Sequence, residues 1–163
     1  MSTKPDWLPD MFPLGRINSE TLDDLYNIFY NDFILGKPKL DTKPVFWDQT
    51  KKDDDKYEEG FWHLIEKLHQ GDEERTFDPY RAEKLPWCAP SIMNFNDAII
   101  KLWEFKESER KIKIYLWLEE FDYVIIFQKR QFRFGEVAFL LTAYHVDYDN
   151  SKRKLQKRYE NRI

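Results

Sequence analysis

The chain has 163 residues, of which 42% are hydrophobic and 17% aromatic, and its formal net charge is −4 at pH 7. This composition excludes a disordered polypeptide and predicts one domain with a hydrophobic core of its own. The weakly acidic net charge neither supports nor excludes a nucleic-acid partner, because a local basic face is what such a partner needs.

Cys88 is the single cysteine, so no disulfide can form within the chain and a reducing compartment is expected. No apolar run approaches the roughly 20 residues that a membrane-spanning helix needs. The N-terminal residues lack the apolar core of a signal peptide. Together these features predict a cytoplasmic protein that does not enter a membrane.

We expect a single domain over residues 1–163, made of an extended arm (1–18), a helical part with short strands (19–105), a β-meander (111–147) and a charged tail (150–163). The arm is rich in proline but also apolar, so we expect it to pack on the domain or on a partner. The tail is expected to be a charged terminal helix or a frayed extension, and an anchor for RNA is one reading of its basic charge.

The first helix is expected to start near Thr21, with Asp24 as its capping residue and Gly36 as its stop. Residues 44–47 are expected to form a short edge strand. The spacing of apolar residues in 60–65 fits a helix and a strand equally well.

Asp78 is a good helix cap because Pro79 follows it at the first helical position. A second helical piece is expected over 91–96. A strand over 98–105 then leads into the meander.

The meander is the clearest pattern in the chain. Residues 112, 114, 116 and 118 are apolar and fall on one side of the first strand, while Lys113, Tyr115 and Trp117 fall on the other. The second run, 123–127, is continuously apolar and is expected to be central. A basic turn over 129–135, closed by a glycine, leads to the last strand. The fold class is therefore predicted as α+β, with N-terminal helices packed on a curved antiparallel sheet.

Patterns that would bind a metal or a cofactor are absent. His63 and His69 are six residues apart, which does not match a pair of ligands on one helix face, and paired cysteines do not occur. The five glycines are scattered and form no phosphate-binding loop, and a serine-hydrolase elbow is missing. We therefore expect no metal and no cofactor.

The remaining residues suit phosphodiester chemistry. His63 could exchange a proton near neutral pH, although it could equally be a hydrogen-bonded core histidine. Arg75 and Arg81 could each clamp a phosphate. The alternative for either arginine is an ion pair with the glutamates around it.

The last strand places Thr142 and Tyr144 two residues apart, so both point to the same face. A hydroxyl and a phenol there could hold phosphate oxygens, and the phenol could stack on a base. His145 points to the opposite face and is expected to be structural. Lys113, Tyr115 and Trp117 form a basic-aromatic face, which suits single-stranded RNA or, alternatively, the packing of a helix.

These residues occur in an order that resembles a known superfamily. A histidine follows a Phe-Trp pair at 61–63, an arginine-bearing segment comes next, and the meander ends in Thr-Ala-Tyr at 142–144. The order is similar to the barnase, EndoU, colicin E5/D and RelE-like nucleases, and most similar to their phage-associated branch. The resemblance covers about residues 60 to 147.

The resemblance implies a metal-independent ribonuclease, or ribonuclease toxin, that cleaves tRNA or mRNA. A ribose 2′-OH would attack the adjacent phosphate, giving a cyclic phosphate and a free 5′-OH. RNA would be the partner, with an antitoxin or other inhibitor protein to restrain the activity. The implied roles are general base or acid for His63, phosphate stabilisation for Arg81 or alternatively Arg75 or Lys67, and hydroxyl contacts for Thr142 and Tyr144.

A second hypothesis is a non-catalytic module with the same fold that binds RNA or protein. The two differ in geometry: an enzyme needs His63, an arginine and the Thr142–Tyr144 pair on one concave face, with His63 partly exposed. A nucleic-acid mimic based on the acidic residues 53–59 is a third reading, which we rank last.

Overall fold

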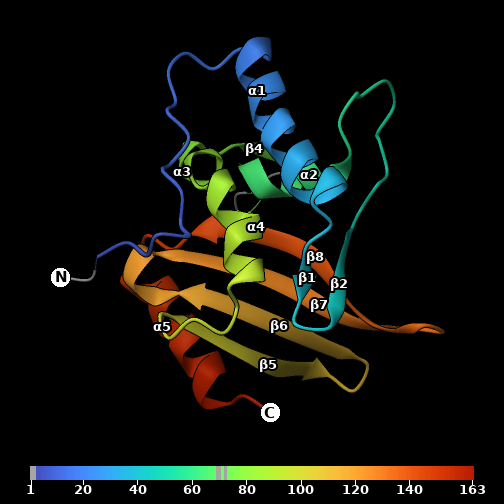
Figure 1. Cartoon of the computed structure of the whole chain (residues 1–163), viewed down its shortest axis with the longest axis vertical. Coiled ribbons are helices and arrows are strands. Elements are labelled where there is room, and N and C mark those ends of the chain that lie inside the picture. The colour runs from blue at the N-terminus through green and yellow to red at the C-terminus, as the bar shows by residue number, and fades with distance from the viewer. Residues whose placement is uncertain (1–2, 69–70, 72) are drawn as a thin grey trace.

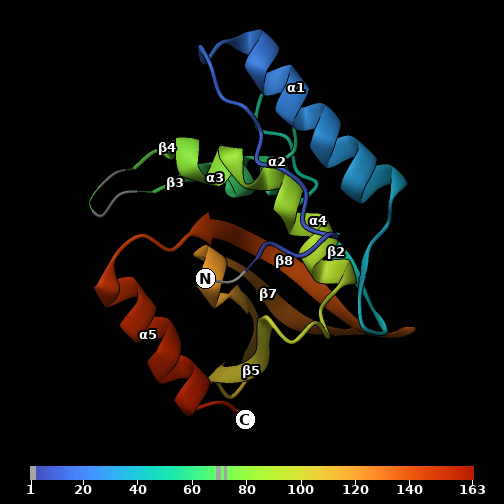
Figure 2. The same cartoon turned by 60° about the vertical axis from the view of Figure 1, so that its left-hand side comes forward.

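A computed structural model of the chain describes residues 3–68, 71 and 73–163, so His69 lies outside the described residues. The protein has an α+β fold, in which a layer of helices covers one face of a curled six-stranded sheet (Figure 1). The C-terminal helix lies against the other side of the sheet, away from the remaining helices (Figure 2). The predicted fold class is confirmed.

The N-terminal arm is anchored on the domain. Leu8 is buried, the indole nitrogen of Trp87 donates a hydrogen bond to the Pro9 carbonyl oxygen (2.7 Å), and that of Trp7 donates to the Asp97 carboxylate (2.8 Å). The arm therefore packs on its own domain.

The first helix, α1 (Ser19–Phe29), begins with a capping box. The Asn18 side chain accepts from the Thr21 backbone, and the Thr21 hydroxyl accepts from the Asn18 backbone. The prediction of Asp24 as the cap was wrong, because Asn18 lies at the true helix start. The helix continues as a π-helical segment, η1 (Tyr30–Leu35), and stops at Gly36 as predicted.

The strand β2 (Lys43–Trp47) is not an edge strand, which corrects the prediction. It pairs with the short β1 (Lys39–Leu40) on one side and runs parallel to the last strand of the chain, β8 (Gly135–His145), on the other. Its partner β8 is distant in sequence, since Val45 pairs with Ala138.

The middle of the chain forms the short helices α2 (Glu59–Ile65), α3 (Pro79–Glu83) and α4 (Leu85–Met93), with a hairpin of β3 (Glu66–Lys67) and β4 (Thr76–Phe77) between α2 and α3. The ambiguous segment 60–65 is thus helical. Asp78 caps α3, as predicted. The second helical piece begins earlier than predicted, because α4 includes Pro86 in its first turn and Pro90 in its interior.

The predicted meander is present as β6 (Lys111–Leu118), β7 (Tyr123–Phe132) and β8, with the 3₁₀ turn η2 (Glu119–Phe121) after β6. The preceding strand, β5 (Ile100–Ser108), pairs with β6, and the sheet order is β1-β2-β8-β7-β6-β5. The register shifts between Ile126–Thr142 and Phe127–Leu140, so β8 has a bulge at Leu141.

The two faces of the sheet are both buried. Ile114, Leu116 and Leu118 face the main core beneath the helices, as their alternation predicts. On the other face, α5 (Asp149–Glu160) covers a second core of aromatic and aliphatic side chains that includes Trp103, Tyr115, Trp117, Val146 and Leu155.

This second core corrects the predicted RNA platform. Tyr115 is 1% exposed and Trp117 is 2% exposed, so neither ring is available for stacking on a base. The Tyr115 hydroxyl accepts a hydrogen bond from Arg158 of α5 (2.9 Å). The alternative reading of this face, helix packing, is the one that the structure shows.

Gly60 sets the distance between α2 and β2, and its replacement by alanine is expected to lower the free energy of unfolding by about 1–3 kcal/mol. An added Cβ would lie 2.8 Å from Trp47 Cδ1 and 3.0 Å from the Asp48 carbonyl oxygen, which accepts the Gly60 N–H. Gly15→Ala is the matched control, since no atom lies within 4 Å of its added Cβ. Urea denaturation of both variants measures the effect, and equal stabilities would contradict it.

Candidate functional site

A pocket of about 620 Å³ brings together residues that lie far apart in the sequence, from Asp48 to Thr142. We call it the His63 pocket, and it is lined by Asp48, His63, Arg75, Lys113, Ile126, Arg130, Phe139, Leu140, Leu141 and Thr142. Its floor is formed by Lys113 and Ile126, on the face of the sheet that α5 covers. Ile126 is paired in register with the buried Tyr115. β2 pairs with β8 only as far as Leu140, and the helices α2 and α3 also contact β8.

The bulge in β8 shapes this pocket. Phe139 and Thr142 are three residues apart, and in a regular strand they would face opposite sides of the sheet. Because Leu141 is the extra residue of the bulge, both line the same pocket. The Thr142 hydroxyl and the Phe139 ring therefore lie on the same face of the sheet.

His63 lies on the half-buried side of α2, since Phe61, Leu64 and Ile65 of the same helix point into the main core. Burial lowers the pKa of the imidazole, and the positive charge of Arg75 lowers it further. Glu59 and Asp48 act in the opposite direction but do not outweigh these two causes. A neutral imidazole at neutral pH can accept a proton.

Asp48 places a carboxylate in the same pocket. Burial would raise its pKa, but hydrogen bonds from Thr50 and the nearby charge of His63 outweigh burial and lower it. One of those bonds runs from the Thr50 backbone to Asp48 Oδ1 at 2.9 Å. Asp48 was not recognised from the sequence, because only the parallel pairing of β2 with β8 brings it to this pocket.

The two candidate arginines differ in their surroundings. Arg75 is exposed, lines the pocket and forms no ion pair with any described residue, so the predicted alternative of an ion pair is not seen. Arg81 is 12% exposed and lies outside the lining of the pocket. Its Nη1 donates to the carbonyl oxygens of Glu66 and His63 and to Thr142 Oγ1 (3.1 Å).

Arg81 also lies 3.5 Å from the buried carboxylate of Asp78. It therefore ties the end of α2, the start of α3 and β8 to one another. Thr142 completes this network, because its hydroxyl donates to the His63 carbonyl oxygen at 3.0 Å. We assign Arg81 as a positioning residue behind the pocket rather than a group on its surface.

The other predicted site residues lie partly inside and partly outside the pocket. Lys113 lines the pocket, where it also pairs with Glu107 (2.9 Å). Tyr144 lies beside the Arg81 guanidinium, with 5.4 Å from Cζ to the ring centroid, and packs on the second core instead of lining the pocket. Lys67, on β3, does not line it either.

Two exposed aromatic rings and one half-buried ring form a cluster near the pocket. Phe132 and Phe134, at the β7–β8 turn, are stacked with centroids 5.7 Å apart, and Phe46 of β2 lies 5.8 Å and 6.1 Å from them. We call these three the hairpin aromatic cluster. Phe46 connects the cluster to the pocket, because it is paired in register with Phe139. The Arg130 guanidinium covers the Phe139 ring at 3.6 Å. The sequence analysis recognised only a basic turn here and missed Arg130 and these rings.

His145 lies outside the pocket. Its Nδ1 is 2.8 Å from the Lys84 ammonium, and its ring stacks on Tyr80 with centroids 5.1 Å apart. Lys84 donates to the Phe121 (2.8 Å) and Asp122 (3.1 Å) carbonyl oxygens. This geometry suits the structural role expected for His145.

Lys84 is expected to make stability depend on pH between 8 and 9. Burial lowers the pKa of its ammonium to about 8 from the usual 10.5, so over this range the unfolded chain binds the proton more tightly. Stability should therefore rise with pH, by roughly 1 kcal/mol per unit. Burial raises the pKa of Cys88 to about 12. Because the thiol of the unfolded chain loses its proton at about pH 8.5, Cys88 opposes this rise in both the wild type and Lys84→Met.

Urea denaturation at pH 8.0 and 9.0 measures this effect. Lys84→Met removes the titrating group, so its lower stability should no longer rise over that interval. The same rise in both proteins would show that another group is responsible.

Among the residues that the structure describes, no group of three or more His, Cys, Asp or Glu side chains could hold a metal ion. No described helix has the length and apolar character needed to cross a membrane. Comparison of the chain with protein-family models, curated proteins and solved structures finds no match. The residues of the pocket are therefore the basis for inferring a function.

Proposed function

We propose that the protein is a metal-independent endoribonuclease that acts at the His63 pocket. The observation that supports this best is the convergence of a half-buried His63, an exposed Arg75 and the carboxylate of Asp48, from three separate parts of the chain, on one pocket. Cleavage of RNA without a metal needs a base and an anion clamp, and these side chains are of the right kinds.

In the proposed reaction, neutral His63 takes the proton from a ribose 2′-OH. The 2′ oxygen then forms a bond to the adjacent phosphorus, the bond from phosphorus to the 5′ oxygen breaks, and the imidazolium returns its proton to that oxygen. The ionised Asp48 stabilises the imidazolium. Arg75, with Arg130 and Lys113, stabilises the charge on the pentacoordinate phosphorus.

The hairpin aromatic cluster supports single-stranded RNA as the substrate. Phe134 is 68% exposed and Phe132 is 40% exposed, and unpaired bases stack on such rings. The cluster takes the place of the platform that the sequence analysis assigned to Tyr115 and Trp117. In keeping with the resemblance, we propose tRNA or mRNA as targets and an inhibitor protein as a partner.

The test is incubation of the purified protein with tRNA, mRNA and single-stranded oligonucleotides in the presence of EDTA. We expect products that end in a 2′,3′-cyclic phosphate and a 5′-OH, and no cleavage where the attacking ribose is replaced by deoxyribose. Cleavage that EDTA abolishes, or that continues at the deoxyribose position, would rule out the proposed reaction.

The alternative is a non-catalytic RNA- or protein-binding module. It is favoured by the position of Arg81, since the resemblance assigns this residue to the phosphate and its guanidinium is instead bound to protein oxygens. RNA that binds with an intact backbone in every substrate of the panel would support this alternative.

A further inference from the structure

A second cavity, of about 660 Å³, lies on the other side of β2 between the hairpin of β1 and β2, the π-helical segment η1 and the residues before α2. We call it the β2 groove. It shares no lining residue with the His63 pocket, although Trp47 of the groove directly precedes Asp48 of the pocket. Its volume lies within the range of small-ligand sites.

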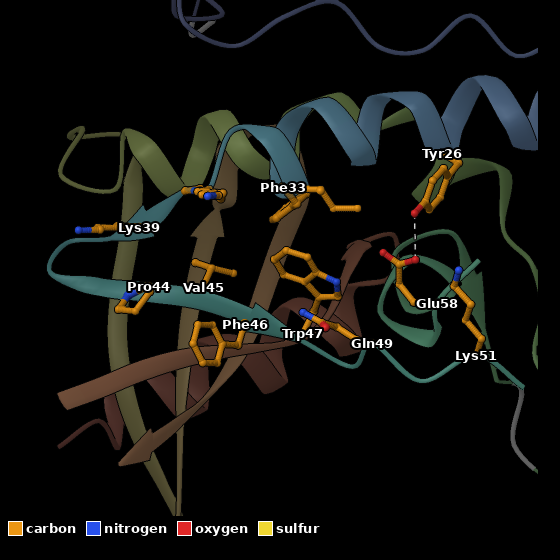
Figure 3. Close-up of a pocket in the computed structure, with 13 residues that line it drawn as sticks. Tyr26, Phe33, Lys39, Pro44, Val45, Phe46, Trp47, Gln49, Lys51 and Glu58 are labelled. Atoms are coloured by element: carbon orange, nitrogen blue, oxygen red, sulfur yellow. Dashed lines mark hydrogen bonds between the residues drawn. The ribbon is translucent and has the colours of Figure 1, made fainter. Parts of the chain in front are cut away.

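The inner wall of the groove is aromatic. Phe33 is fully buried, and its ring meets that of Trp47 edge to face with centroids 5.8 Å apart. Val45 is also buried on this wall. Figure 3 shows Phe33 and Trp47 side by side, with Lys39 at one end of the cavity and Glu58 and Lys51 at the other. A flat apolar ring is the kind of group that such a wall accommodates.

A buried carboxylate lies at one end. Glu58 is 5% exposed, and its Oε2 accepts a hydrogen bond from the Tyr26 hydroxyl at 3.0 Å. Burial and the adjacent carboxylate raise the pKa of Tyr26 to about 12, so the phenol keeps its proton and holds Glu58 in place. No described residue donates to Oε1 of Glu58, which leaves this oxygen to accept from a ligand.

The indole nitrogen of Trp47 adds a second polar group. It is buried and has no acceptor among the described residues, and in Figure 3 it lies on the side of the ring that faces Glu58. Leaving such a buried donor unsatisfied is unfavourable. A ligand that carries donors and an acceptor along one edge would satisfy both groups.

Three lysines line the groove. Lys37, Lys39 and Lys51 are exposed, and none pairs with a carboxylate of a described residue. Lys39 lies at the end of the groove opposite Glu58 (Figure 3), and Lys37, which also lines the groove, is separated from Lys39 in sequence by Pro38 alone. This is a local excess of positive charge on a chain whose net charge is −4, so a negatively charged group is favoured here.

We propose that the β2 groove binds a mononucleotide. The base would lie against the half-buried ring of Trp47, with N–H groups of its edge donating to Glu58, and the phosphate would lie at Lys37 and Lys39. Guanine suits the carboxylate well, because its ring N–H and amino group are two donors side by side. The site is separate from the His63 pocket and does not depend on cleavage activity.

The experiment is a titration of ¹⁵N-labelled full-length protein with guanosine 5′-monophosphate, followed on the indole N–H resonances of the six tryptophans. Trp47→Phe identifies the resonance of Trp47. We expect that resonance to shift and to reach saturation. Guanosine without phosphate should bind more weakly, and inorganic phosphate should not move the Trp47 resonance.

The double variant Lys37→Ala/Lys39→Ala is expected to raise the Kd about tenfold, the loss of one charge-assisted hydrogen bond. Arg110→Ala/Lys111→Ala removes the same charge from an exposed turn at the far end of the sheet and should leave the Kd unchanged. Equal effects of the two double variants would overturn the proposal, as would an unmoved Trp47 resonance.

Two further outcomes would also overturn it. A Trp47 shift with inorganic phosphate alone would mean that the groove binds any anion. Loss of the shift in Arg75→Ala would place the nucleotide in the His63 pocket. Because the readout is binding at Trp47, a protein that cleaves no RNA can still pass this test, and an active ribonuclease can fail it.

Discussion

Replacing His63 with alanine is expected to slow RNA cleavage about a thousandfold while the fold is kept. A positioned general base contributes roughly 10²- to 10⁴-fold to a rate, and His63 is the only described histidine in the pocket. The side chain is half-buried on α2 and forms no side-chain hydrogen bond with any described residue, so its loss should leave the main core intact. Single-turnover cleavage of a labelled oligonucleotide measures the rate.

The matched control is His145→Gln, which changes a half-buried histidine that lies outside the pocket. We expect this variant to cleave at the wild-type rate. Full activity in His63→Ala, or equal losses in the two variants, would remove His63 from the reaction.

The pH dependence of cleavage should also reflect the titration of His63. Burial and then the charge of Arg75 lower the pKa of His63 below its usual 6.5, and a base acts only in its neutral form. Activity should therefore be constant at neutral pH and fall with a midpoint below 6.5. In Arg75→Ala the residual activity should fall at a higher pH than in the wild type, because a positive charge near the imidazole is gone.

The sheet was predictable from the sequence because its signals are local. The alternation in 111–118 and the apolar run in 123–127 fix which residues are buried and which strands are neighbours. The role of the outer face was not predictable in the same way. Tyr115 and Trp117 are covered by Leu155 and Tyr159 of α5, about 40 residues further along the chain. The many charged residues of α5 suggested a solvated tail rather than a helix that covers a core.

The candidate site, like the sheet, was predictable from the sequence only in part. The sequence placed His63 and Thr142 in one site, and the structure places them in one pocket. It could not separate Arg75 from Arg81, since both lie in one acidic segment. The separation comes from α3: Asp78 caps the helix, and its carboxylate lies 3.5 Å from Arg81 in the interior. Asp48 was missed because only the parallel pairing of β2 with β8 brings it to the site.

Arg81 and Arg75 are therefore expected to give opposite results on mutation to alanine. Arg81→Ala removes the cation beside the buried Asp78 carboxylate and the side-chain donor to the carbonyl oxygen of Glu66. Breaking a buried ion pair in this way should cost about 3 kcal/mol of the free energy of unfolding. Urea denaturation measures this loss, and cleavage should fall only in proportion to the unfolded fraction and to any displacement of His63.

Arg75→Ala removes an exposed side chain, so its free energy of unfolding should stay within about 0.5 kcal/mol of the wild type. Its cleavage rate should fall about a hundredfold, because the charge that stabilises the pentacoordinate phosphorus is lost. The two variants thus separate a residue that holds the pocket together from one that acts in it. If Arg81→Ala is as stable as the wild type yet cleaves no RNA, Arg81 contacts the substrate directly and the roles assigned here are reversed.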